Sequence, residues 1–380
     1  MTYIERALDL KALLTNKSYF LFGPRQTGKS TLIRETLKEF KYYNLNDSRL
    51  YREFSTAPEL LNERLKGDEK IVIIDEIQRV PELLNEVQIA IDEKNINFLL
   101  TGSSARKLRR GGVNLLGGRA RRLRMHPLCY FELKEKFDLL TALNFGLIPS
   151  TYFSASPSDD LEAYCGDYLE LEIAAEGLTR NIPAFGRFLE VAALTSGEML
   201  NYENVSNDAQ VPKSTVYEYF KILRDTLIGD DLPAWTRSIK RKPLQTSKFY
   251  FFDTGVVRTL RQQAYVKMKS PEFGHLFESY IHHELRCYLS YSHTSGLAYW
   301  RSTSNFEVDF ILHESIAIEV KAKTQVSKKD LNGLMALREE NLLKRYLVIS
   351  LESESRMVDG IEIVPWQEFL IMLWQFQFKT

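Results

Sequence analysis

The chain has 380 residues, 44% of them hydrophobic and 26% charged, a composition that fits an ordinary folded protein and excludes a disordered or fibrous one. Its 50 lysines and arginines equal its 50 aspartates and glutamates, so no global charge draws it to nucleic acid or to an anionic membrane. At this length several domains are expected, and the sequence predicts three, at 1–150, 151–265 and 266–380.

Cysteine spacing and hydropathy indicate the compartment. Cys129, Cys165 and Cys287 are far apart and form no C-x-x-C pair, so neither a disulfide framework nor a zinc site is expected. No stretch approaches the about 20 apolar residues that cross a bilayer. We therefore expect a cytoplasmic protein in a reducing environment, with no membrane partner.

Residues 18–130 alternate short apolar runs with longer amphipathic segments. The candidate strands are 19–22, 71–74 and 98–100, and the candidate helices are 29–40 and 83–93. Continuous apolar runs of this length are typical of strands that are buried on both faces of a parallel sheet. The first third is therefore predicted to be an α/β domain with a parallel sheet.

The segment Gly23–Ser30 matches the phosphate-binding pattern G-x-x-x-x-G-K-[ST] at every fixed position. Glycine lets consecutive backbone N–H groups turn onto phosphates, and the helix expected from Lys29 adds a positive N-terminus. Lys29 is predicted to reach the β and γ phosphates of ATP, and Ser30 to ligate Mg²⁺. The residues predicted to contact the nucleotide are Gly23, Pro24, Arg25, Gln26, Thr27, Gly28, Lys29, Ser30 and Thr31. The competing interpretation is a glycine turn with an incidental lysine.

The apolar run 71–74 ends in two acids, Asp75 and Glu76. Asp75 is predicted to bind the nucleotide site's Mg²⁺ shell, and Glu76 to orient and deprotonate the attacking water. In the alternative interpretation both acids serve only as caps of the next helix. However, two acids after four buried residues are costly unless a cation lies beside them.

The strand at 98–100 leads into Thr101-Gly-Ser-Ser104, where a polar residue would lie between the two motifs and position water against the γ-phosphate. Ser103 is the residue predicted for this role, and a helix N-cap by Ser103 or Ser104 is the alternative. A basic run follows, without an acid before Phe131. Within it Arg119 is predicted to be an arginine finger, in cis or in a neighbouring subunit, and a phosphate-backbone contact is the alternative.

From 161 to 227 the sequence indicates helix after helix. A polar turn at 207–212 precedes a helix from Ser214, and the alternating run 248–252 is a candidate wing, so the pattern predicts a winged helix. The candidate DNA contacts are Lys213, Ser214, Thr215 and Tyr217. The same helix carries acids, so packing against protein stays an alternative.

A third α/β unit is predicted from about residue 270, with a helix at 278–289, strands at 306–312, 316–320 and 346–350, and a helix at 329–339. Asp309 and Glu319 are expected on adjacent antiparallel strands, with Lys321 on the same face as Glu319. Two carboxylates can bind Mg²⁺ while a lysine steadies the nucleophilic water. The alternative is an exposed strand face with an ion pair that is worth little.

Two resemblances follow from these residues. The N-terminal motifs, the Leu-Gly-Gly-Arg119 segment and the phrases 250–255 and 274–278 resemble AAA+-type ATPases of bacteria and archaea whose C-terminal half is a domain of unknown function. That resemblance implies ATP binding with Mg²⁺, a helical and winged-helix middle and a nuclease-like end. Asp309, Glu319 and Lys321 resemble the PD-(D/E)xK nuclease core, in which Glu278 matches the acid that often completes the metal site, although Val308 replaces a proline.

The sequence thus predicts an Mg²⁺-dependent ATPase coupled to a winged helix and a restriction-endonuclease-like domain that acts on DNA. The first alternative is an ATP-dependent switch that binds nucleic acid, protein or a second copy of itself and whose nuclease-like domain is inactive. The second alternative is a small-molecule kinase. His282 and His283 are predicted to be surface residues.

Overall fold

The structure is a computed structural model that describes residues 3–102, 116–172, 181–375 and 377–378. The chain divides into two compact units. The first comprises Met1–Leu128 with Leu223–Ile228, and the second comprises Cys129–Ile222 with Gly229–Thr380. None of the helices in the described ranges is both long enough and apolar enough to span a membrane.

The first unit contains a five-stranded sheet in which every pairing is parallel, which confirms the predicted sheet type. Its strands are β1 (Ser18–Phe22), β2 (Lys41–Asn44), β3 (Ile71–Asp75), β4 (Asn97–Gly102) and β5 (Ala120–Arg124). Their order is β2-β3-β4-β1-β5, so β4 lies between β1 and β3. Because all strands run the same way, the residues that follow β1, β3 and β4 meet at one edge of the sheet.

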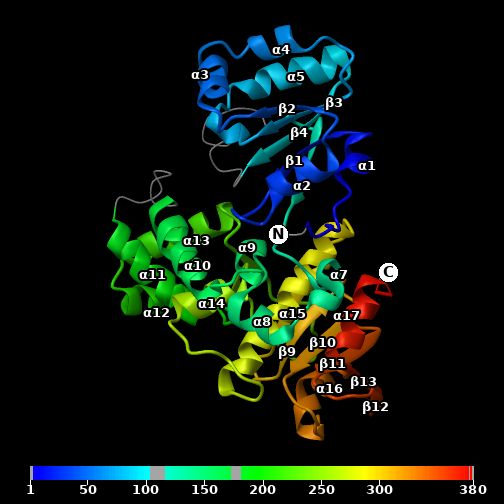
Figure 1. Ribbon diagram of the computed structural model, residues 1–380. Helices are drawn as coiled ribbons and strands as arrows, with labels where there is room; N and C mark the ends of the chain where they lie inside the picture. The colour runs from blue at the N-terminus through cyan, green and yellow to red at the C-terminus, as the bar shows by residue number, and fades with distance from the viewer. Residues whose placement is uncertain (1–2, 103–115, 173–180, 376, 379–380) are drawn as a thin grey trace. The chain divides into compact units, whose positions relative to one another are not determined.

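Helices cover both faces of this sheet, with α2 and α5 on opposite sides (Figure 1). The helices of the unit are α1 (Leu10–Leu14), α2 (Lys29–Thr36), α3 (Ser48–Thr56), α4 (Leu60–Arg64) and α5 (Leu83–Lys94), with a 3₁₀ turn at Ile77–Arg79. Apolar side chains of β1, β3 and β4 pack in one core with Phe54 of α3, Leu61 of α4 and Val87 of α5. This double coverage explains why β1 and β3 are buried along their whole length.

The second unit begins with short helices. Its helices are α7 (Tyr130–Leu133), α8 (Leu139–Phe145), α9 (Pro149–Tyr152), α10 (Pro157–Ala163), α11 (Ile182–Leu194), α12 (Tyr202–Ala209), α13 (Lys213–Asp225), α14 (Thr254–Leu260), α15 (Pro271–Tyr291), α16 (Asn332–Arg338) and α17 (Trp366–Trp374), with a π-helical stretch at Tyr164–Glu172 and 3₁₀ turns at Lys134–Lys136 and Lys328–Leu331. The last residues of α13 are grouped with the first unit.

The division between the units differs from the boundary predicted near residue 150. The chain around that boundary is helical, and Pro149 and Pro157 each stand in the first turn of a helix, α9 and α10. The residues before it pack within the second unit, where the Leu147 amide donates to Asp253 at 2.7 Å and Thr254 donates to the Ala142 carbonyl at 2.6 Å.

Helices α11 to α13 are followed by a two-stranded antiparallel sheet of β6 (Gly229–Leu232) and β7 (Lys248–Phe251). The run predicted as the wing, 248–252, thus contributes the strand β7 to this sheet. The segment between β6 and β7 bonds to the edge of a second sheet, because the Trp235 amide donates to the Tyr299 carbonyl at 2.6 Å and the Leu244 amide to the Arg301 carbonyl at 2.8 Å. These backbone bonds fix β7 next to the C-terminal part of the same unit.

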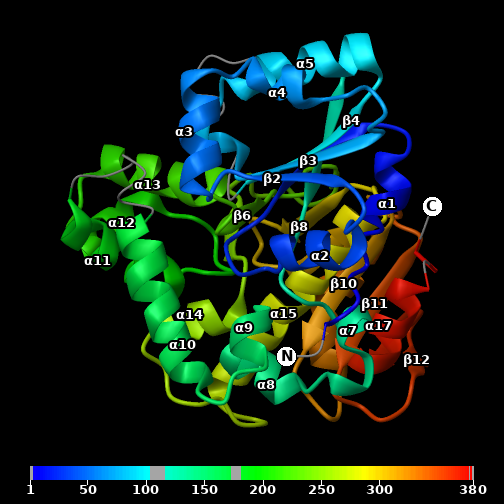
Figure 2. The ribbon, with the colours of Figure 1, turned by 45° about the horizontal axis from the view of Figure 1, so that its top comes forward.

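That second sheet has six strands in the order β12-β13-β11-β10-β9-β8. They are β8 (Leu297–Arg301), β9 (Glu307–Leu312), β10 (Ile316–Lys321), β11 (Arg345–Ser350), β12 (Arg356–Val358) and β13 (Ile361–Pro365). The predicted antiparallel pairing of β9 and β10 is confirmed, and β10 pairs with β11 in parallel. Helix α15 runs along β10 and α17 along β11 (Figure 2). Helix α16 packs on β9.

Candidate nucleotide site and acidic site

The phosphate-binding pattern forms the turn between β1 and α2. Gly28 is the N-cap of α2 and has φ +95°, a left-handed conformation that glycine adopts without strain. A Cβ atom on Gly23 would lie 2.4 Å from the Met125 carbonyl oxygen, so only glycine fits this position as well. Both fixed glycines of the pattern thus have a backbone reason to be glycine.

Lys29 is buried and its ammonium group turns back on its own loop. It donates to the carbonyl oxygens of Gly23 at 2.7 Å and Pro24 at 2.8 Å. Burial lowers the pKa of this lysine to about 8, against the opposing effect of Glu76 and Asp75. The two carbonyl oxygens that this ammonium contacts are neutral, so an anionic phosphate would be a stronger partner, and the loop fits a nucleotide.

The remaining loop residues divide by exposure. Arg25 and Gln26 are exposed, whereas Thr27 is buried and donates to the Pro24 carbonyl at 2.8 Å. Thr31 is exposed in the first turn of α2. Thr27 thus braces the loop from inside.

Asp75 accepts hydrogen bonds from hydroxyl groups on three different elements. Ser30 of α2 donates to Asp75 Oδ2 at 3.1 Å, Tyr42 of β2 donates to the same oxygen at 2.6 Å, and Thr101 of β4 donates to Oδ1. The Ser30 hydroxyl and the Asp75 carboxylate are oxygen ligands of the kind that Mg²⁺ prefers, so these two residues fit the predicted metal shell.

Glu76 stands at the same edge in a left-handed conformation, with φ 63°. Its amide donates to the Thr101 hydroxyl at 3.2 Å, and the Gln78 side-chain amide donates to Glu76 Oε2. The other end of that amide, Gln78 Oε1, is buried without a hydrogen-bond partner among the described residues. An acceptor of this kind beside a carboxylate suits a bound water.

Sequence reasoning missed Tyr42 and Gln78, and it chose Ser103 where Thr101 makes the observed contacts. Ser103 lies outside the described residues. Thr101 is the last residue but one of β4, the strand between the two motifs, and that signal was available from the sequence. Tyr42 becomes visible only through the register that pairs β2 with β3, and Gln78 only through the turn at Glu76.

Arg119 lies at the sheet edge away from the phosphate-binding loop. It precedes β5, whose first residue Ala120 pairs with Ser18 at the start of β1. Its guanidinium group donates to Asp92 at 2.7 Å. In this arrangement Arg119 does not reach the loop of its own chain. The prediction that Arg119 acts as an arginine finger in a neighbouring subunit stays a prediction.

The acidic site of the second unit is built on β9 and β10. Asp309 Oδ2 accepts from the Val320 amide at 2.7 Å, and Lys321 donates to Glu319 Oε1. Glu319 is only 7% exposed, and its second oxygen, Oε2, has no hydrogen-bond partner among the described residues. An ionised oxygen in that position is costly unless it is given a cation or a proton.

The pKa values of this site reflect crowded negative charge. Burial, with the charge of Glu278, raises the pKa of Asp309 to about 7. Burial, with the charge of Asp309, raises the pKa of Glu319 to about 8. Burial acts to lower the pKa of Lys321, but Glu319 and Asp309 overcome it and raise that pKa.

Glu278 of α15 belongs to a neighbouring group of contacts. Its Oε1 accepts from the Tyr250 hydroxyl at 2.6 Å and lies 3.6 Å from the Lys248 ammonium, which also pairs with Glu307 at 2.8 Å. In the part of the chain that the structure describes, no three His, Cys, Asp or Glu side chains converge as a metal site. The contacts of Glu278 are thus with Lys248 and Tyr250, and its role as a metal ligand stays a prediction.

The predicted exposure of His282 and His283 is wrong. They are 4% and 8% exposed, because the middle of α15 packs inside the second unit. His282 stacks on Tyr250 with ring centroids 4.0 Å apart, and the Nε2 atom of His283 lies 3.4 Å from the Cys287 sulfur. These contacts bury the middle of the helix.

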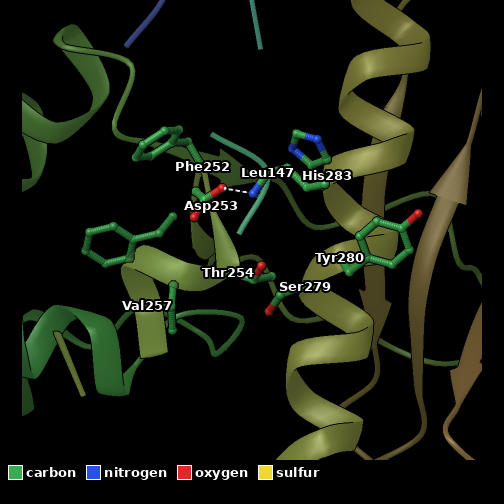
Figure 3. Close-up of a pocket in the computed structure, with 9 residues that line it drawn as sticks. Leu147, Phe252, Asp253, Thr254, Val257, Ser279, Tyr280 and His283 are labelled. Carbon is green, nitrogen blue, oxygen red and sulfur yellow. Dashed lines mark hydrogen bonds between the residues drawn. The ribbon is translucent and has the colours of Figure 1, made fainter. Parts of the chain in front are cut away.

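A small cavity lies between α14 and α15 in the second unit (Figure 3). Asp253 and Leu147 form the hydrogen bond drawn there, and Ser279, Tyr280 and His283 line another part of the wall. Its volume of about 10 Å³ has room for one water at most. This cavity cannot be the acceptor pocket that a small-molecule kinase would need.

Comparison with known families divides the chain into three segments. An AAA domain matches residues 15–134, one domain of unknown function (DUF8612) matches 136–267, and another (DUF4143) matches 273–369. The first segment covers the sheet and the nucleotide site of the first unit, and the other two lie in the second unit apart from residues 223–228.

Similar proteins come from distant organisms. An uncharacterized protein of Mycobacterium tuberculosis is 24% identical over 361 residues, which cover 92% of this chain and 80% of that protein. One of Methanocaldococcus jannaschii is 24% identical over 438 residues, covering 98% and 86%. Among solved structures, a signal transduction ATPase with numerous domains (STAND) and a tetratricopeptide repeat sensor from Pyrococcus horikoshii has 11% identity and a TM-score of 0.22, covering 78% of this chain and 49% of that one.

The loop geometry and the AAA-domain match together support a P-loop ATPase. An AAA-type ATPase domain suggests nucleotide binding and hydrolysis, typically with Mg²⁺.

Proposed function

We propose that the chain hydrolyses ATP with Mg²⁺ at the edge of the first unit's sheet. The observation that carries this proposal is the 3.1 Å contact between the Ser30 hydroxyl of the loop and the Asp75 carboxylate of β3. It joins the element that binds phosphates to the one that holds metal. Bound Mg²⁺ would neutralise charge on the β and γ phosphates, with Ser30 and Asp75 as the residues that hold it.

The other side chains of the edge have separate tasks in this proposal. Lys29 exchanges its two carbonyl acceptors for phosphate oxygens. Glu76 accepts the proton of the attacking water, and Gln78 keeps the Glu76 carboxylate in place through its amide. Thr101 fixes the distance between the two acids, because it contacts Asp75 and the Glu76 amide together.

We further propose that the second unit acts on DNA and that ATP hydrolysis in the first unit is coupled to this action. The order of three helices and a two-stranded antiparallel sheet from α11 to β7 supports a winged helix. The placement of Asp309, Glu319 and Lys321 on paired strands supports a nuclease-like core. Mg²⁺ is again the cation that two such carboxylates would bind.

The test measures ATP turnover and DNA cleavage together. We expect Glu76→Gln to lower kcat by about 10²- to 10⁴-fold while ATP still binds, because the base is lost but the phosphate contacts stay. Glu82→Gln, at the exposed N-cap of α5, is the matched control and should keep normal turnover. Undiminished hydrolysis in Glu76→Gln would remove that residue from the mechanism.

The same assay includes single- and double-stranded DNA with Mg²⁺ or Mn²⁺. Stimulated ATPase with cleavage that Lys321→Met abolishes supports an active nuclease. Stimulation without cleavage supports the second candidate, an ATP-dependent switch whose nuclease-like part is inert. The observation that favours the switch is the ion pair that Lys321 and Glu319 already form.

A further inference from the structure

Lys248 is a buried lysine that sequence reasoning did not connect with the acidic site. It is 4% exposed, it stands at the start of β7, and the backbone bonds of the preceding segment hold that strand against the C-terminal part of the unit. Its ammonium lies 2.8 Å from Glu307 Oε1, 3.6 Å from Glu278 Oε1 and 5.3 Å from the centre of the Tyr299 ring. A buried ammonium needs such partners, and here two of them are carboxylates.

These contacts divide the carboxylates of the site into two pairs. Glu278 and Glu307 share Lys248, and Glu307 has a further cation in Arg301 at 3.2 Å. Asp309 and Glu319 form the second pair, in which Glu319 Oε1 accepts from Lys321, whereas the buried Glu319 Oε2 has no partner among the described residues. The first pair already has its positive charge, and the second pair has an oxygen that still lacks one.

We propose that Lys248 takes the place of a second metal ion, so that the acidic site binds one divalent cation through Asp309 and Glu319. The inference rests on the proposed metal binding of the nuclease-like core, and it adds the number of cations and the residues that do not bind one. In this arrangement Lys248 is a positioning residue. It holds Glu278 and Glu307 away from the metal, and it connects β7 to the site.

The experiment counts bound Mn²⁺ by electron paramagnetic resonance on the full chain without nucleotide. All proteins carry Asp75→Asn, which removes the carboxylate predicted to hold metal in the nucleotide site. We expect one Mn²⁺ per chain in this parent. Adding Lys248→Met should raise the number to two, because Glu278 and Glu307 then lack a cation. Lys242→Met, an exposed lysine of the preceding segment, is the control and should leave one.

Two further variants keep the test independent of how well Lys248→Met folds. Glu319→Gln should weaken the single site by at least about 10-fold, which is the loss expected when a metal's surroundings are disrupted. Glu278→Gln should leave one Mn²⁺, with an affinity within about 3-fold of the parent, since this residue faces the lysine and not the metal.

The outcomes separate the two proposals. Two Mn²⁺ in the parent, or loss of the site in Glu278→Gln, would overturn the role of Lys248 and leave the proposed nuclease-like metal site intact. A count of one that persists in folded Lys248→Met would also overturn it. No Mn²⁺ in the parent would overturn both the inference and the metal-dependent part of the proposed function.

Discussion

In the first unit Asp75 faces three neutral hydroxyl groups, whereas in the second unit Glu278 and Glu307 face the ammonium group of Lys248. Hydroxyl groups orient a carboxylate without cancelling its charge, so the charge of Asp75 stays available for a cation that arrives with a nucleotide. A lysine cancels charge permanently. The comparison teaches that neutral donors hold the Asp75 carboxylate, whereas a cation of the protein itself holds the Glu278 and Glu307 carboxylates.

The largest effect is expected for Arg119, and it tests whether the nucleotide site contrasts with the acidic site in its supply of positive charge. If the nucleotide site takes a further cation from a neighbouring copy, Arg119→Ala should lower kcat by about 10³-fold or more, the size of an arginine-finger effect. Mixing Arg119→Ala with Glu76→Gln should then restore turnover that neither variant has alone, because each supplies what the other lacks. Steady-state ATPase of the mixture is the measurement.

Arg121→Ala is the matched control, since Arg121 is an exposed arginine on the adjacent strand. It should leave turnover unchanged. Normal turnover in Arg119→Ala as well would reduce that residue to its ion pair with Asp92, a partly exposed pair of the kind that contributes little to stability.

The comparison sharpens at Glu284, a buried carboxyl of α15 whose contacts are neutral donors, the Tyr130 amide at 2.7 Å and the Trp374 indole at 3.1 Å. Burial is the main cause that raises the pKa of Glu284 to about 7. The folded protein therefore binds this proton more tightly than the unfolded chain, whose glutamate has a pKa of about 4.3. The stabilising contribution is complete below that value and is lost as the pH rises to about 7.

We expect Glu284→Gln to remove this pH dependence. Relative to the variant, the wild type should lose roughly 3 kcal/mol of stability between about pH 4.3 and pH 7, and the loss should level off above about pH 8. Thermal unfolding at several pH values gives the difference. Glu272→Gln, exposed in the first turn of the same helix, serves as the control. Parallel curves for the wild type and Glu284→Gln would show that folding does not raise the pKa of this carboxyl.

Much of the nucleotide site follows from local sequence. The loop at Gly23–Ser30 and the acids Asp75 and Glu76 each follow a buried strand, so parallel strands alone bring them to one edge. Tyr42 does not follow in this way. Its contact depends on the register in which Asn44 pairs with Asp75, and no local pattern gives that register.

The acidic site was harder to predict for the same reason. Asp309, Glu319 and Lys321 are close in sequence and lie on two consecutive strands, so spacing was enough to group them. Lys248 comes from a separate two-stranded sheet, and backbone bonds between the preceding segment and β8, among them those from Trp235 and Leu244, bring it near. Likewise His282 looked like a surface residue because the sequence does not show that Tyr250 packs on it.

The smallest effect is expected at Tyr42, and it tests whether hydroxyl groups alone position Asp75. Tyr42→Phe removes the 2.6 Å bond to Asp75 Oδ2 and leaves the ring in place. The Mg²⁺ concentration for half-maximal ATPase should rise about 10-fold, the usual cost of losing a group that orients a metal ligand, while kcat at saturating Mg²⁺ stays within about 3-fold. A magnesium titration of steady-state turnover measures both.

Tyr43→Phe is the matched control for this titration. Tyr43 is the next residue of β2, so its side chain points to the opposite face of the sheet, where its ring packs edge-on against Phe54 with centroids 5.4 Å apart. Losing that hydroxyl should not change the magnesium requirement. If Tyr42→Phe and Tyr43→Phe gave the same curve as the wild type, Ser30 and Thr101 would position Asp75 without Tyr42. In the contrast with Glu278 and Glu307, which Lys248 holds, Asp75 would then be held by two hydroxyl groups and not by three.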